Sequence, residues 1–336
     1  MEVVASWPSR TELAEVAGWA QRAERLGVDV IHVPETIHDP FTVAALMLTG
    51  TERVVVRTSM VVAFPRSPML TAYAAWDLQR LSRGRFQLGV ASQVRGNIVG
   101  RFSAEWSEPV ARLGDYVGAL RAIFHAFRTG EELAYAGPHY VFDRLQPYFN
   151  PGPIDHPAPP IWTGGVNPRM VALAAEVSDG FVCHPTSSHP DVMRADILPV
   201  LAGGPRVVAG PQPLMAATTD ALRQARDERR RELGFLYSTP AYRRQLELFG
   251  LEDLGQTLTE LARREDWDDL GRHLTDDVLA RLVPEGTYDE IPEVLGHWYA
   301  GLCDGIVLSL PEDPTHDDAL RTLVDRCRNI PGTLRA

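Results

Sequence analysis

Two side chains that can move a proton stand close together after a short apolar run. The run covers residues 28–33, and Glu35 and His38 follow it. A histidine with a neighbouring carboxylate can donate or accept a proton near neutral pH. We therefore predict Glu35 and His38 as catalytic residues, whereas Asp39 directly before Pro40 is more typical of a helix N-cap.

A paired-glycine turn could seat the phosphate of a cofactor. Gly164 and Gly165 follow a predicted strand, and a helix is expected to begin at Pro168. Glycine lets a ligand approach the backbone closely, and the free amides and dipole of a helix start favour an anion. The alternative is a tight turn before a capped helix, because the segment matches neither common nucleotide-binding glycine motif. The predicted cofactor-binding residues here are Thr163, Gly164, Gly165, Val166 and Asn167.

Polar donors follow the predicted strand at residues 86–90. Hydroxyl, amide and guanidinium groups can hydrogen-bond the carbonyls of a ring or the carboxylate of a ligand. Aromatic rings near strand ends suit a partly apolar substrate. The residues predicted on these grounds are Ala91, Ser92 and Gln93 for the cofactor, and Trp7, Phe64 and Arg95 for the substrate.

Composition argues against several other functions. The net charge of −11 is not accompanied by a basic cluster, which disfavours nucleic-acid and anionic-membrane partners. The cysteines, Cys183, Cys303 and Cys327, are widely spaced, so no disulfide framework is expected. We predict no metal site, because His184 and His189 lack a ligand spacing. With no signal peptide and no apolar run of about 20 residues, we expect a cytoplasmic protein.

Eight short apolar strands that alternate with helices must position these residues. The segment 54–62 is too continuously apolar to face water on one side, which is typical of a parallel sheet covered by helices. We predict a closed (β/α)8 TIM barrel, in preference to an open doubly wound sheet, with its reactive groups at the carboxyl ends of the strands. A capping box at Ser9 and Glu12 predicts the first helix start, and residues 207–217 are predicted to form a bent seventh strand.

The chain is predicted to be a single domain over residues 1–336, with two additions to the barrel. Prolines interrupt an irregular excursion at about 130–160. A largely helical insertion occupies about 220–282 and is longer than one strand-to-strand crossover needs.

Several motifs carry a family resemblance. The most specific is the run Leu81-Ser82-Arg83-Gly84-Arg85-Phe86, and others lie at residues 23–29, 57–62, 164–165 and 179–181. Together they resemble the bacterial-luciferase-like flavin and deazaflavin oxidoreductases, over nearly the whole chain. The resemblance implies a luciferase-like barrel whose third strand carries a bulge with a non-prolyl cis peptide between Ser59 and Met60. Both residues are then expected to contact the cofactor ring.

Within that family, residues 63–68, 93–95 and 149–153 resemble the branch that uses coenzyme F420. A deazaflavin transfers hydride and does not readily activate oxygen. The resemblance therefore implies hydride transfer to a C=C, C=N or C=O bond of a small-molecule, natural-product or peptide-like substrate. The alternatives are a two-component monooxygenase that uses reduced FMN and oxygen, and a cofactor-less barrel acting as a binding or assembly subunit. We also expect a homodimer.

Overall fold

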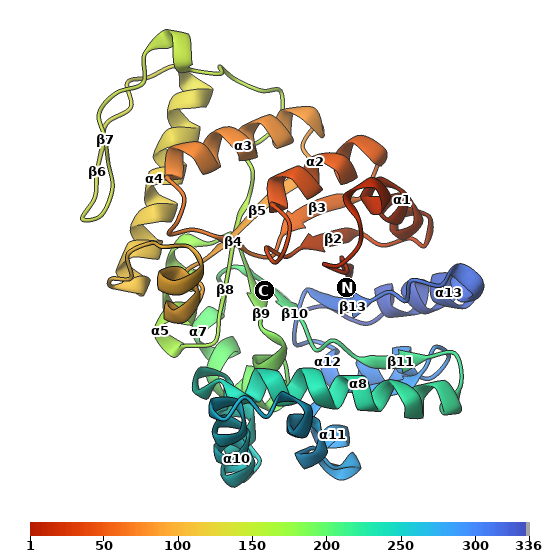
Figure 1. Ribbon diagram of the computed structural model, residues 1–336. Coiled ribbons are helices and arrows are strands. Elements are labelled where there is room, and N and C mark those ends of the chain that lie inside the picture. The colour runs from red at the N-terminus through yellow and green to blue at the C-terminus, as the bar shows by residue number, and fades with distance from the viewer. Residues whose placement is uncertain (334–336) are drawn as a thin grey trace.

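Parallel strands close into a barrel that is ringed by helices (Figure 1). The computed structural model describes residues 1–333. Around the barrel the order is β1, β2, β3, β5, β8, β9, β10 and β13, and the β1–β13 and β3–β5 pairs close it. The strand bounds are β1 (Glu2–Ser6), β2 (Val30–Val33), β3 (Val55–Thr58), β4 (Val61–Val62), β5 (Phe86–Ala91), β8 (Ile161–Gly165), β9 (Gly180–Cys183), β10 (Arg206–Ala209) and β13 (Gly305–Ser309). The predicted TIM barrel is confirmed.

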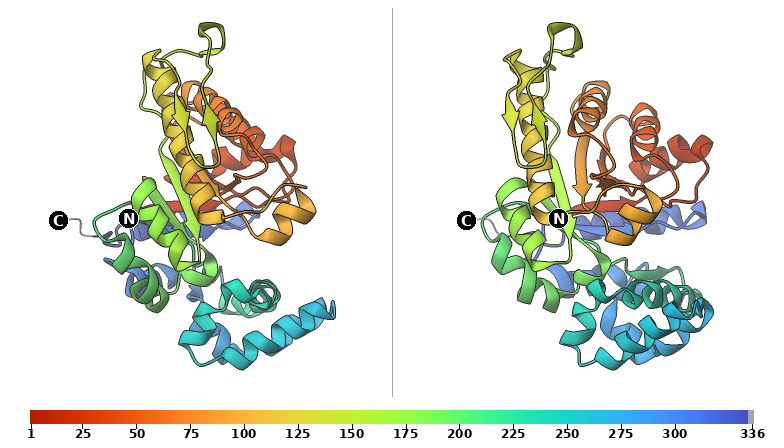
Figure 2. Two further views of the ribbon diagram at one scale, coloured as in Figure 1. Left: turned by 90° about the vertical axis from the view of Figure 1, so that its left-hand side faces the viewer. Right: turned by 60° about the vertical axis from the view of Figure 1, so that its left-hand side comes forward.

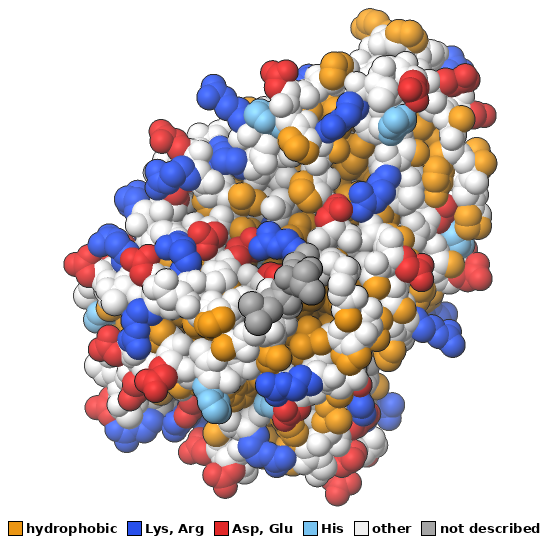
Figure 3. All heavy atoms as spheres, turned by 180° about the vertical axis from the view of Figure 1, so that it is seen from behind, with side chains coloured by type: hydrophobic (Ala, Val, Ile, Leu, Met, Phe, Trp, Pro, Cys, Tyr) orange, Lys and Arg blue, Asp and Glu red, His pale blue; other side chains and the backbone are white. Residues whose placement is uncertain are grey.

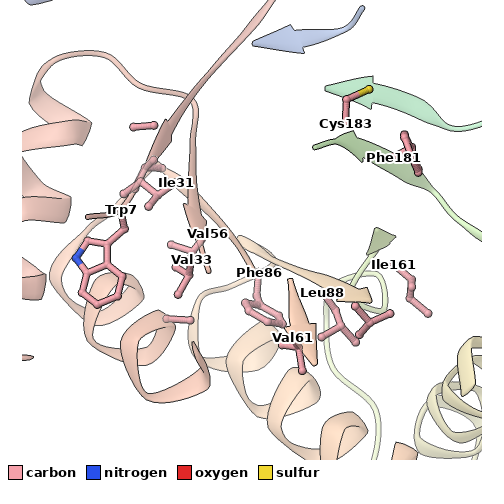
Figure 4. Packing of buried hydrophobic residues seen from close by; sticks show 14 of the residues in the cluster. Trp7, Ile31, Val33, Val56, Val61, Phe86, Leu88, Ile161, Phe181 and Cys183 are labelled. Carbon is pink, nitrogen blue, oxygen red and sulfur yellow. The ribbon is translucent and has the colours of Figure 1, made fainter. Parts of the chain in front are cut away.

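Outward-facing strand residues form the main core against the helices. Ile31, Val56, Leu88 and Phe181 belong to this core and are completely buried (Figure 4). The covering helices are α1 (Val16–Arg25), α2 (Pro40–Gly50), α3 (Pro68–Leu81), α4 (Pro109–Thr129), α5 (Pro168–Val177), α6 (Pro190–Val192), α7 (Leu198–Leu201), α12 (Ile291–Tyr299) and α13 (Asp317–Arg328).

Four of these helices, α2, α3, α5 and α6, combine a side-chain cap with proline at the first position. Asp39, Ser67, Asn167 and His189 each accept a hydrogen bond from a backbone N–H of the first turn. The capping box predicted at Ser9 and Glu12 is wrong. The chain there forms a 3-10 turn over Leu13–Glu15 before α1, and Glu12 makes no side-chain cap bond.

Alternate strand residues fill the inside of the barrel. Arg57 is fully buried there; its guanidinium donates to Gln87 and Glu2, contacts His32 at 3.0 Å, and lies 3.4 Å from the Trp162 ring centroid. A second interior cluster is apolar and consists of Val4, Val30, Trp162, Val182, Val208 and Val307, with Met60 packed against it. The interior is therefore a packed core and not a pore.

Two additions extend from the barrel in opposite directions (Figure 2). Within the excursion, β6 (Tyr135–Ala136) and β7 (Val141–Phe142) form a small hairpin beside α4. The helical insertion contains α8 (Thr219–Ser238), α9 (Arg244–Leu248), α10 (Glu252–Arg263) and α11 (Asp276–Leu282), and it has an apolar cluster of its own.

The seventh strand is shorter than expected. It ends at Ala209, and β11 (Leu214–Ala216) instead pairs with β12 (Glu285–Thr287) in a separate two-stranded sheet beside the insertion. On the face shown in Figure 3, acidic and basic side chains are interspersed. Within residues 1–333, no helix has both the length and the apolar character needed to cross a membrane.

Candidate active site at the barrel mouth

The carboxyl ends of the strands form a mouth whose inward-facing residues are accessible to solvent. Val4, Val182 and Val307 are buried, but residues at the strand ends, such as Met60, Ala91 and Gly164, are half-buried. Ser309, the last residue of β13, is exposed. The packed interior of the barrel thus ends at a solvent-accessible surface at the carboxyl ends of the strands, where active sites of this fold occur.

A bulge interrupts the third strand at this mouth. β3 ends at Thr58, β4 resumes at Val61, and the intervening Ser59–Met60 peptide is cis, as the resemblance implied. The Ser59 N–H donates to the Val33 carbonyl at 2.8 Å. Thr58 Oγ1 donates to the Gly89 carbonyl at 2.9 Å and accepts from the Gly89 N–H at 2.8 Å. Both neighbouring strands therefore hold the bulge.

The Met60 side chain lies across the mouth, in space left by two glycines. A Cβ on Gly89 would stand 2.6 Å from Met60 Sδ and 2.0 Å from the Thr58 carbonyl oxygen. A Cβ on Gly164 would stand 3.2 Å from Met60 Cε and 3.0 Å from the Val182 carbonyl oxygen. Gly89 was missed in the sequence, although a glycine inside a strand indicates a close backbone approach.

Glu35 braces the same bulge. Its carboxylate accepts from the Val62 N–H at 2.7 Å and from Arg66 Nη1 at 2.8 and 2.9 Å, and its side chain is only 5% exposed. Arg66 also contacts Asp39 at 3.2 Å. The carboxylate is thus engaged by a positive charge and a backbone amide, which indicates that Glu35 positions the bulge.

His38 lies at the mouth, half-buried, with its ring centroid 5.8 Å from that of Trp7. Two buried polar atoms beside it, Trp7 Nε1 and Thr36 Oγ1, have no hydrogen-bond partner among residues 1–333. Buried polar groups are normally paired with protein, water or a ligand. Two buried polar atoms that follow β1 and β2 therefore have unused hydrogen-bonding capacity.

Two aromatic residues predicted as substrate contacts are largely enclosed by protein. Trp7 and Phe64 are 2% and 4% exposed and belong to the main core. Phe64 packs edge-on against Trp106, with centroids 5.8 Å apart. Both rings pack within the core, and a substrate contact by either one stays a prediction. Arg95, in contrast, is exposed.

Side chains of the loop after β5 mostly shape the loop itself. Ser92 Oγ donates to the Gln93 carbonyl at 3.2 Å, and Gln93 Oε1 accepts from the Val94 N–H at 2.8 Å. Gln93 has a φ of 61°, which places it in the left-handed region. Ala91 is half-buried at the strand end, where its carbonyl accepts from the Ala63 N–H at 3.0 Å.

The helix start after β8 offers fewer free amides than the sequence suggested. Pro168 has no N–H, the Arg169 N–H donates to Asn167 Oδ1 at 2.9 Å, and Met170 and Val171 donate to the Asn167 carbonyl. The prediction of unused amides in this first turn is therefore wrong, because Asn167 satisfies them.

Two further residues of the predicted phosphate seat serve packing. Thr163 is buried, and its hydroxyl lies 2.7 Å from Ser178 Oγ. A Cβ on Gly165 would stand 2.7 Å from Met170 Cγ, so this glycine lets α5 pack closely. Gly164, Gly165 and Val166, at the end of β8 and directly after it, are half-buried.

His184, directly after β9, is a mouth residue that the sequence did not identify as a binding residue. Its Nδ1 accepts from the Thr186 N–H at 3.3 Å and lies 2.8 Å from Thr186 Oγ1. Its ring stacks on Tyr242 of the helical insertion, with centroids 4.4 Å apart. Burial lowers the pKa of His184 to about 4, so the imidazole is neutral at physiological pH.

Comparisons with known proteins agree with this geometry. Residues 2–304 match the family model described as luciferase-like monooxygenase. The uncharacterized protein Rv1360 of Mycobacterium tuberculosis is 33% identical over 305 residues, covering 88% of this chain and 90% of that protein.

Two solved structures share the fold. The coenzyme F420 dependent tetrahydromethanopterin reductase from Methanopyrus kandleri has a TM-score of 0.78 at 14% identity, with 97% of each chain covered. The oxygenating constituent of 3,6-diketocamphane monooxygenase from Pseudomonas putida, in complex with FMN, has a TM-score of 0.66 at 14% identity, with 100% of each chain covered. With its cis-peptide bulge at the mouth of a TIM barrel, the chain belongs to the luciferase-like monooxygenase family of flavin and deazaflavin oxidoreductases.

Proposed function

We propose that the protein is an oxidoreductase that binds coenzyme F420 in the barrel mouth. Its substrate would be a small, natural-product or peptide-like molecule with a C=C, C=N or C=O bond. When bound, a reduced deazaflavin supplies hydride. The protein would position the substrate against the ring and exclude water from the site.

One observation carries the proposal. The Met60 side chain fills space left by Gly89 and Gly164 and packs against the apolar barrel interior. A flat ring needs an apolar floor without projecting Cβ atoms, and Met60 with Gly164 provides one. Ser59, Ala91 and the backbone of Gly164, Gly165 and Val166 border this floor, so these residues would hold the cofactor.

In this proposal His38 handles the proton. It is the half-buried imidazole that follows β2, whereas Glu35 is already occupied by Arg66 and the Val62 amide. Histidine titrates near neutral pH and can therefore exchange a proton with a substrate atom. Glu35 would act indirectly, by fixing the bulge on which the ring rests.

A second candidate is the FMN-dependent monooxygenase. The fold similarity to a monooxygenase in complex with FMN supports it, because that protein binds FMN on the same fold.

Equilibrium binding separates the candidates. The purified protein is titrated with F420 and, separately, with FMN, each in oxidised and reduced form, and the fluorescence of the cofactor is followed. We expect tighter binding of F420. Tighter binding of reduced FMN, together with substrate-dependent oxygen consumption, would favour the monooxygenase. Binding of neither cofactor would overturn both and favour a binding or assembly subunit.

A further inference from the structure

His184 occupies an inward-facing position at the mouth. Side chains alternate along a strand, and Val182, two residues earlier on β9, belongs to the interior cluster. His184 is half-buried, whereas its neighbour Cys183 is buried in the outer core. The imidazole therefore lies in the mouth, on the same side of the chain as Val182 and two residues closer to the carboxyl end of the strand.

The hydrogen bonds of His184 fix its tautomer. A backbone N–H can only donate, so the Thr186 N–H requires an unprotonated Nδ1 as its acceptor. Since the ring is neutral, its single proton must then be on Nε2. Stacking on Tyr242 holds the plane of the ring. His184 consequently presents a donor of fixed direction and no charge.

This donor has no partner in the protein. Nε2 forms no hydrogen bond with any residue in the range 1–333, and it is not one of the buried polar atoms left without a partner. It is therefore open to solvent. The turn of 185–187 that fixes His184 is next to the β8–α5 loop and the insertion. A small cavity brings the three together and is bordered by Val166, Pro168, Thr186, Ser187, Tyr242 and Arg244.

We propose that His184 is a cofactor-binding residue, whose Nε2–H donates to an oxygen atom of the bound redox cofactor beside the β8–α5 loop. Tyr242 is then a positioning residue, and through it the helical insertion becomes part of the cofactor site. This inference rests on the proposed function, because it assigns a contact of the same mouth. The first-turn amides of α5 already donate to Asn167, so His184 Nε2–H would supply the cofactor with a hydrogen-bond donor that they do not.

The first test is NMR spectroscopy of the full-length protein with 15N-labelled histidine rings. The His184 resonances are assigned by their loss in His184→Gln. We expect the neutral Nε2–H tautomer at pH 7 and a shift of its Nε2 and Hε2 resonances when F420 is added. An Nδ1–H tautomer, or His184 resonances unmoved at saturating F420, would overturn the proposal.

The second test compares cofactor affinities of variants. His184→Phe keeps an aromatic ring for the stack but loses the donor, and we expect F420 to bind roughly tenfold more weakly. His184→Gln places an amide N–H near the position of Nε2 and should recover most of the affinity. Equal F420 binding by His184→Phe and the wild type would contradict the inference.

His189 is the matched control. It also follows β9, and its Nδ1 accepts from the N–H two residues later, at Asp191, but its ring lies between Phe249 and Trp298. His189→Gln should leave F420 affinity unchanged. If the wild type bound F420 normally and only the His184 predictions failed, the proposed function would stand and this inference alone would fall.

Discussion

At the scale of single residues, the mouth separates side chains that brace the site from those that are free to act. Glu35 and Thr58 form hydrogen bonds that hold the bulge, and Asn167 accepts a hydrogen bond at a helix start. His38 and His184 keep accessible imidazoles. Residue type alone suggested Glu35 as a proton donor. Its Arg66 partner comes from a later segment, and only the fold brings the two together.

Replacing Glu35 tests the bracing role. Glu35→Gln removes one charge of a largely buried ion pair, and we expect the free energy of unfolding to fall by about 1–3 kcal/mol. Cofactor affinity should fall with it, because the bulge loses an anchor. Urea denaturation and cofactor titration measure the two effects. Asp39→Asn, which alters the exposed partner of the same Arg66, should change stability by well under 1 kcal/mol. Similar losses in both variants would argue against a special role for Glu35.

At the scale of elements, the sequence predicted the strands and helices well, because their apolar periodicity and proline-marked helix starts are local signals. The sequence predicted less well which backbone amides are hydrogen-bonded by a neighbouring side chain and which rings pack into the core. The helix start at Pro168 was placed correctly, but its amides are already paired. Trp7 and Phe64 were placed correctly at strand ends, but they pack within the core. Whether a side chain faces the mouth or the core depends on register and packing, which a single sequence does not reveal.

Gly89 of β5 makes the bulge between β3 and β4 possible. A Cβ there would overlap the Thr58 carbonyl oxygen at 2.0 Å, and backbone cannot move aside as a flexible side chain can. We expect Gly89→Ala to destabilise the protein by about 2 kcal/mol or more and to abolish cofactor binding. Gly18→Ala is the control, because nothing lies within 4 Å of its Cβ position in α1. That variant should be neutral or slightly stabilising in thermal denaturation. A Gly89→Ala protein as stable as the wild type would contradict this description of the bulge.

At the scale of the whole molecule, three histidines couple folding to pH. Burial lowers the pKa of His32, His184 and His189, and the charge of Arg57 lowers that of His32 further. In the unfolded chain a histidine has a pKa of about 6.5, so the unfolded state binds more protons below that pH. Their contribution to stability is therefore complete above about pH 6.5 and is lost as the pH falls.

We accordingly expect the melting temperature to decline between pH 7 and pH 5. Each histidine that stays neutral in the folded state lowers the free energy of unfolding by up to about 1.4 kcal/mol for each pH unit below about 6.5. His184→Gln should reduce the slope. His125→Gln, at a largely exposed histidine, is the matched substitution for comparison. The carboxyl groups with a lowered pKa affect stability only at lower pH, where they take up protons; they are Glu24, Glu290 and Asp313. A melting temperature that is constant from pH 7 to pH 5 would contradict the linkage.

The homodimer expected from the sequence remains a prediction. It is supported by α2, which carries no charged residue and leaves Ala45 and Leu46 only half-buried. A helix that is apolar on all sides is normally covered. Light scattering should give a mass of about twice 37.2 kDa, whereas a mass of 37.2 kDa at micromolar concentration would show a monomer.

The central claim is that a tricyclic redox cofactor rests on Met60. It is tested most directly by NMR of protein with 13C-labelled methionine methyl groups, with the Met60 signal assigned from Met60→Leu. Adding F420 should shift the Met60 methyl resonance strongly, by the ring current of the cofactor. The methyl of Met193, which is completely buried in the outer core, should stay in place. If the protein bound F420 and the Met60 signal did not move, the cofactor would lie elsewhere and the claim would be wrong.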